Sequence, residues 1–200
     1  MSKVLVTESY LTDISNAIRS KNGDSTKYKP SEMAAAIKNI KAQDNTAVNS
    51  IIDRTISGDY TNNDVTSVGK YAFAFCPYLK TVTMANCTNI NSNAFYDCTG
   101  LTSANFSNVK TVYSSAFNNS GLTSITFNKL VTLGSNSDYS GIFESTPMTS
   151  ISIPSTIQTI GLYALSYSSI KTITVNRDKD AISGSPWGAA NATVNWTGRM

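Results

Sequence analysis

The segment VTSVGKYAFAFCPYLKTVTM, residues 65–84, contains one complete unit of a repeat that covers most of the chain. The unit consists of an apolar pair three residues apart, an Ala-Phe dipeptide, and a final run with the spacing apolar-x-x-apolar-x-apolar. Its apolar positions are Val65, Val68, Ala72, Phe73, Leu79, Val82 and Met84. Short apolar runs of this kind, separated by turn residues, predict short strands joined by tight turns.

The same three patterns recur at intervals of about 22 residues, with one longer interval in the fourth unit. The large residue of the dipeptide recurs at Phe73, Phe95, Phe117, Phe143 and Leu165. The apolar pairs are Val65/Val68, Cys87/Ile90, Val109/Val112, Leu130/Leu133 and Ile157/Ile160. The final runs begin at Leu79, Leu101, Leu122, Met148 and Ile170. Five units that agree at three separate places predict about five coils of a solenoid.

Within one unit, alternation decides which side chains face inward. In LTSITF, residues 122–127, Ile125 and Phe127 point to one face of a strand while Thr126 points to the other. A single unit cannot bury its own apolar face, but stacked units cover one another. We therefore expect the strands to form a parallel sheet along the stack.

The repeat resembles the BspA-type leucine-rich repeat, over about residues 51–182. The resemblance implies a leucine-rich-repeat solenoid of about five coils with a parallel sheet. The fourth unit departs from the family's pattern through extra residues at 134–141, which we expect to form a loop at one edge. The domain boundaries predicted from these patterns are a helical hairpin at 1–45, a linker and N-terminal cap at 46–64, the solenoid at 65–182 and a C-terminal cap at 183–200.

Helical spacing of apolar residues appears only near the N-terminus. Leu11, Ile14 and Ile18 predict one helix over 8–21, and Met33 and Ile37 predict a second over 31–41. The fold class expected for the whole chain is therefore α+β.

The hairpin and two other segments resemble bacteriophage tail proteins. The sequence of the hairpin, LTDISNAIRSKNG at 11–23 followed by YKPSEMAAAI at 28–37, resembles a segment of tail proteins from phages and prophages of Gram-positive bacteria. Residues 50–56 and 185–196 resemble the joints that flank the repeats in those proteins. The resemblance implies that the hairpin attaches to other tail proteins or pairs with a second copy of the chain.

Composition argues against several classes of function. The chain has no histidine, which removes Ser-His-Asp catalysis and His-containing zinc sites. Its net charge is +3, without a basic cluster, so we expect no nucleic-acid partner. No stretch is long and apolar enough to span a membrane, and no signal peptide is evident, so we expect a protein made in the bacterial cytoplasm.

The residues that most often carry catalysis have structural interpretations here. Cys76 and Cys98 occupy the same place in successive units, and Cys87 replaces a valine, so all three are interpreted as small buried apolar residues rather than metal ligands. Asp178 and Asp180 could form a carboxylate pair for glycoside hydrolysis, but the neighbouring cations favour a solvated turn. We expect no catalytic residue, no metal and no cofactor.

Two sets of residues that we expect on the surface are candidates for ligand binding. Outward strand positions form two polar rows, Thr81, Ser103, Ser124, Ser150 and Thr172, and Thr83, Asn105, Thr126, Ser152 and Thr174. They could bind a glycan or protein, or simply form a hydroxyl ladder that satisfies itself and water. The turns carry tyrosines that offer a rival surface, Tyr78, Tyr96 and Tyr139 among them. The tryptophans at 187 and 196 are interpreted as end caps rather than ligand-stacking residues.

These observations lead to a hypothesis about function. We expect a non-enzymatic phage or prophage tail component, located in the virion, whose repeat domain recognises a glycan or protein on a bacterial cell surface. The alternative is an adhesion or protein-interaction module of a bacterial surface protein, since BspA-type repeats also occur in adhesins. An enzyme acting on cell-wall glycans is the third class.

Overall fold

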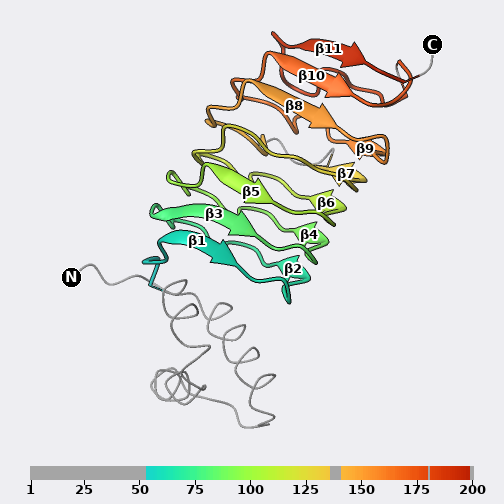
Figure 1. Cartoon of the computed structure of the whole chain (residues 1–200). Helices are drawn as coiled ribbons and strands as arrows, with labels where there is room; N and C mark the ends of the chain where they lie inside the picture. Colours follow the sequence, from blue (N-terminus) through green and yellow to red (C-terminus); the bar gives the residue numbers. More distant parts are fainter. Residues whose placement is uncertain (1–52, 136–140, 180, 199–200) are drawn as a thin grey trace. The chain divides into compact units, whose positions relative to one another are not determined.

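The computed structural model describes residues 53–135, 141–179 and 181–198, which belong to a compact unit spanning Asp53–Met200. Parallel strands are stacked in this unit as the rungs of a solenoid (Figure 1). The described ranges contain strands and turns and no helix. The helical hairpin predicted at 1–45 and the central part of the loop predicted at 134–141 lie outside the described residues.

The strands form two columns along the stack, and every pairing in both columns is parallel. The first column contains β1 (Gly58–Thr61), β3 (Leu79–Thr83), β5 (Ser103–Asn105), β8 (Ser150–Ile153), β10 (Thr172–Val175) and β11 (Thr193–Trp196). Single bridges through Thr126 connect β5 to β8. The second column contains β2 (Ser67–Val68), β4 (Asn89–Ile90), β6 (Thr111–Val112), β7 (Thr132–Leu133) and β9 (Thr159–Ile160). The parallel-sheet solenoid expected from the repeat is confirmed.

Alternation along the strands separates the core from the surface. In β8, Ile151 and Ile153 are buried while Ser150 and Ser152 are exposed. A shift of one residue would place the isoleucines in water, so the apolar spacing also fixes the register between coils. This is the alternation that the sequence predicts.

The turns between the columns are stacked by a separate ladder of main-chain hydrogen bonds. Phe75, Asp97 and Asn119 occupy equivalent places in three coils, and each has a positive φ. Their N–H groups donate to carbonyl oxygens of the following coil at 2.7, 2.9 and 2.8 Å. A left-handed conformation costs a residue other than glycine about 1–2 kcal/mol. The hydrogen bond that it makes possible to the neighbouring coil helps to offset that cost.

The core contains a column of stacked phenylalanine rings. The centroids of Phe73 and Phe95 lie 5.1 Å apart, those of Phe95 and Phe117 5.3 Å, and those of Phe117 and Phe143 5.7 Å. The rings are nearly parallel, with interplanar angles of 12°, 1° and 6°. Each ring is covered by the equivalent ring of the adjacent coil, so burial of the core depends on stacking.

The prediction of about five coils is too low, because the structure contains about six. A further strand precedes the first repeat unit and another follows the last. β1 lies within the segment expected to be a linker and cap, and pairs with β3. β11 lies within the expected C-terminal cap, and pairs with β10. Neither strand belongs to a unit with all three apolar patterns, so the spacing alone did not identify them.

Trp187 continues the core at the C-terminal end. Its side chain has no exposed surface, its ring centroid lies 6.1 Å from that of Trp196, and its Nε1–H donates to the carbonyl of Ser183 at 2.8 Å. Its own carbonyl accepts the N–H of Leu165 at 2.9 Å. These contacts are those of a residue that covers the last apolar coil, which agrees with the capping interpretation.

Candidate functional site

The outward positions of the first strand column form a surface that we call the hydroxyl face. It comprises the two predicted rows, Thr81, Ser103, Ser124, Ser150 and Thr172, and Thr83, Asn105, Thr126, Ser152 and Thr174. The strand register places members of each row opposite one another. The paired residues are Thr81 with Ser103, Thr83 with Asn105, Asn105 with Thr126, Thr126 with Ser152, Ser150 with Thr172, and Ser152 with Thr174. The structure therefore brings together the two rows that sequence reasoning singled out, with rungs about 4.8 Å apart.

The rows are longer than the repeat pattern indicates. Asp59 and Thr61 of β1 pair with Thr81 and Thr83 at one end. Thr193 and Asn195 of β11 pair with Thr172 and Thr174 at the other. The sequence contained a signal for the second pair, because Thr-Val-Asn at 193–195 has the same spacing as Ser-Ala-Asn at 103–105.

Most side chains of the hydroxyl face have unused hydrogen-bonding capacity. Every member is exposed or half-buried. Thr81 Oγ1 donates to Asp59 Oδ1 at 2.7 Å, and Asn105 Oδ1 accepts from Ser107 Oγ at 3.2 Å. The other eight residues make no side-chain hydrogen bond to the described part of the chain. The hydroxyls therefore bond little to one another, and these groups are available to water, as in the ladder alternative, or to a ligand.

The charge of the face is close to zero. None of the ten predicted residues is ionisable, and only Asp59 at the N-terminal edge adds a carboxylate. A neutral array of donors and acceptors on a rigid sheet suits a ligand rich in hydroxyl or amide groups, because such a ligand gives up hydrogen bonds to water and regains them on the protein.

The predicted tyrosines do not form one cluster with the rows. Tyr78 comes directly before β3, is 63% exposed, and lies beside the start of the hydroxyl face. Tyr96 lies in the turns between β4 and β5, where its ring meets Phe75 edge-on at 5.5 Å. Tyr139 is outside the described residues. Of the two tyrosines that the structure describes, Tyr78 is the one directly before a strand of the hydroxyl face.

The three cysteines are buried in the core, as expected. Burial raises the pKa of the thiols of Cys76 and Cys87, and it raises the pKa of Cys98 to about 12. The Sγ of Cys98 lies 2.9 Å from the carbonyl oxygen of Phe73, to which the thiol donates. A buried thiol with a raised pKa is a poor nucleophile, because the thiolate is the reactive form.

The described residues contain no group of three or more His, Cys, Asp or Glu side chains placed to hold a metal ion. Asp178 is exposed in a turn after β10, and Asp180 lies outside the described residues. Among the described segments, none is a helix with the length and hydropathy needed to cross a bilayer.

Comparison with known proteins agrees with the repeat. A family model described as the BspA type leucine rich repeat region matches the chain in six copies, over residues 54–140 and 137–185. No curated protein matches the chain. The copies cover well over half of the sequence, and repeats of this type are protein-interaction or adhesion modules that are generally not enzymatic. The chain belongs to the BspA-type leucine-rich-repeat family.

Proposed function

We propose that the chain is a non-enzymatic phage or prophage tail component that recognises a bacterial cell surface through the hydroxyl face. The observation that carries the recognition step is the array of neutral, outward side chains whose hydrogen-bonding groups are mostly unused. The partner expected for it is a surface glycan or an extended protein segment with hydroxyl or amide groups along its length.

A stacked sheet is suited to binding such a ligand at several points. Each hydrogen bond to a neutral group contributes about 0.5–1.5 kcal/mol, so one contact gives little affinity. The side chains of the face are carried by strands whose register is set by the apolar core, so ordering them costs little additional entropy on binding. Several weak contacts on a preorganised surface add up to recognition of a polymer.

The tail assignment is supported by sequence. Residues 11–23 and 28–37 resemble a segment of phage and prophage tail proteins, and the segments around 50–56 and 185–196 resemble joints in the same proteins. On this proposal the N-terminal segment attaches the chain to other tail proteins or to a second copy, and the protein is located in the virion.

A second candidate, an adhesion module of a bacterial surface protein, is equally compatible with the family match. The recognition surface would be the same in both cases, and the difference lies in what carries it. Antibodies against the chain would label the tails of particles released by prophage induction on the first proposal. Labelling of intact producer cells, without labelled particles, would instead favour the adhesin.

The recognition step can be tested with the full chain, fluorescently labelled, on a panel of Gram-positive cells and their wall extracts. We expect selective, saturable binding to some strains. The variant Thr126→Arg/Ser150→Arg puts two large charged side chains on the outer surface of the face without entering the core. It should weaken binding at least about tenfold, because the inserted side chains block the rows and several contacts are lost together.

The matched control is Gln158→Arg, which adds the same side chain at an exposed position before β9 in the other strand column. It should bind as the unmodified chain does. Equal binding by the double variant, or no binding to any strain by a multimerised chain, would exclude the hydroxyl face as the recognition surface.

A further inference from the structure

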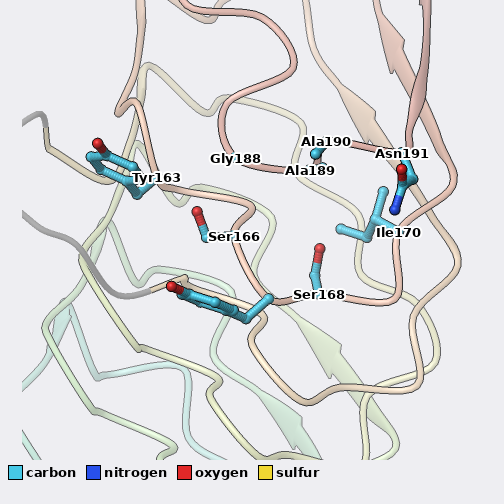
Figure 2. Close-up of a pocket in the computed structure, with 9 residues that line it drawn as sticks. Tyr163, Ser166, Ser168, Ile170, Gly188, Ala189, Ala190 and Asn191 are labelled. Carbon is cyan, nitrogen blue, oxygen red and sulfur yellow. The ribbon is translucent and has the colours of Figure 1, made fainter.

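A cavity of about 430 Å³ lies in the last coils, between turn residues and the residues that come just before β10 and β11. It is formed where the segment 163–170 meets the segment 188–191 (Figure 2). Its volume falls within the range of about 300–1,000 Å³ that is typical of small-molecule sites. None of the residues that line it is charged.

Two tyrosines supply flat, partly apolar walls. Tyr163 is 38% exposed and Tyr167 is 76% exposed, although both belong to the stacked turns of a rigid solenoid. The main chain of Tyr167 is held in place, because its carbonyl accepts the N–H of Ser145 in the adjacent coil at 3.2 Å. Exposed tyrosine rings offer a large contact area, and their two rotatable side-chain bonds keep the entropic cost of binding low.

The hydroxyl of Ser166 lines this cavity. Ser166 is only 5% exposed, and its Oγ makes no hydrogen bond to the described residues. Its Oγ points towards Gly188, where a Cβ would lie 2.0 Å from it. Glycine at 188 therefore leaves room for the hydroxyl. Because Ser166 lines the open cavity, its hydroxyl is left for water or for a ligand to pair with.

The opposite side of the cavity combines an amide with apolar carbons. The side chain of Asn191 is exposed and makes no hydrogen bond to the described residues. Beside it in Figure 2 lies Ile170, which is 4% exposed, and Ala189 is 6% exposed. An amide next to an apolar patch matches an acetamido group, whose N–H and carbonyl need partners while its methyl does not.

We propose that this cavity binds an N-acetylated hexosamine unit of a neutral glycan. The apolar face of the pyranose ring would lie on Tyr167, a ring hydroxyl would pair with Ser166, and the acetamido group would lie against Asn191 and Ile170. The proposal deepens the recognition of a bacterial surface described above, because it names a class of sugar. It concerns other residues than the two polar rows of the hydroxyl face, and it does not depend on the tail assignment.

The test uses the full chain and free N-acetylglucosamine, with glucose as the matched sugar that lacks the acetamido group. Saturation-transfer NMR and a titration followed by tyrosine fluorescence should give saturable binding with a dissociation constant of about 1 mM, as expected for a single sugar in a shallow site. Glucose should bind at least about fivefold more weakly. Equal binding of the two sugars would overturn the assignment of the acetamido group.

Three variants locate the site. Tyr167→Ala should weaken binding about tenfold, and Asn191→Ala and Ser166→Ala about three- to tenfold each. Ser166→Ala is the most informative, because removing an unpaired hydroxyl should leave the unfolding midpoint unchanged or raise it, whereas a purely structural role would lower it. Tyr78→Ala, which removes another exposed tyrosine, should bind the sugar normally.

No saturable binding of N-acetylglucosamine, or binding that all three variants leave intact, would overturn the proposal. Either result would leave the cell-binding experiment untouched, because its variants lie on the hydroxyl face and its readout needs no free sugar. If the chain fails to bind cells but still binds N-acetylglucosamine, the sugar site stands and the recognition role of the hydroxyl face does not.

Discussion

Ser120 is a buried hydroxyl that should destabilise the solenoid. It is 3% exposed, and its Oγ has no hydrogen-bond partner among the described residues. It occupies the place that Cys76 and Cys98 hold in the two preceding coils. Replacing it with cysteine keeps a side chain of similar size while removing a hydroxyl that loses its bonds to water on folding.

The expected change in the free energy of unfolding is estimated from the cost of burying that hydroxyl. A buried polar group without a partner costs about 1–3 kcal/mol, and the surrounding packing is kept in Ser120→Cys. We expect the free energy of unfolding to rise by about 1 kcal/mol, which corresponds to an increase in Tm of about 2–4 °C for a chain of this size. Urea unfolding followed by tryptophan fluorescence, with a reductant present to keep thiols free, measures the change.

The control uses the same place one coil later. Thr146 is 2% exposed, and its Oγ1 donates to the carbonyl of Phe143 at 2.8 Å. Thr146→Val keeps the shape and removes that bond, so it should lower the free energy of unfolding by about 1 kcal/mol. The two substitutions are therefore expected to have opposite signs. If Ser120→Cys lowers stability as Thr146→Val does, the hydroxyl of Ser120 has a partner in solution and the reasoning is refuted.

Three further predictions concern the thiols and the turns. The three buried thiols should not react with a thiol reagent at pH 8 in the folded chain, and they should react once urea unfolds it. A colorimetric count of reactive thiols measures this difference, and rapid reaction in the folded state would contradict their burial. Because burial raises the pKa of Cys98 from 9.0 to about 12, the folded chain retains a proton that the unfolded chain loses, so unfolding midpoints should fall as pH rises above about 9; a flat profile would contradict this prediction. Gly100→Ala should lower stability by about 1–3 kcal/mol in urea, since its Cβ would lie 2.2 Å from the carbonyl oxygen of Pro77. Gly69→Ala, where a Cβ meets nothing within 4 Å, should have little effect, and equal losses at both glycines would show that the close approach is not the cause.

Much of the solenoid could be predicted from the sequence because each coil obeys a local rule. The alternation of Ile151 and Ile153 with serines fixes which face of a strand is buried, whatever lies above or below it. The recurrence of Phe95 and Phe117 at the same place predicts that those rings meet once the coils stack, and their centroids lie 5.3 Å apart. The two polar rows follow from the same alternation.

Other features depend on contacts between coils, which the spacing of apolar residues in the sequence does not predict. The strand β1 has no complete repeat unit, and it is recognisable only because Asp59 and Thr61 pair with the following coil. The left-handed conformation of Phe75 is similarly invisible in sequence, since its N–H finds its acceptor on a neighbouring turn.

The sequence by itself determined the repeat, its inward and outward faces and the chemical character of the surface, because alternation and period act within one coil. Only the tertiary structure decided which polar groups lack partners and where turns enclose space. Ser166 and Asn191 are distant in sequence and look like ordinary polar residues there. They line one cavity because the final coil brings Gly188 against Ser166, and that approach depends on the stacking of whole coils.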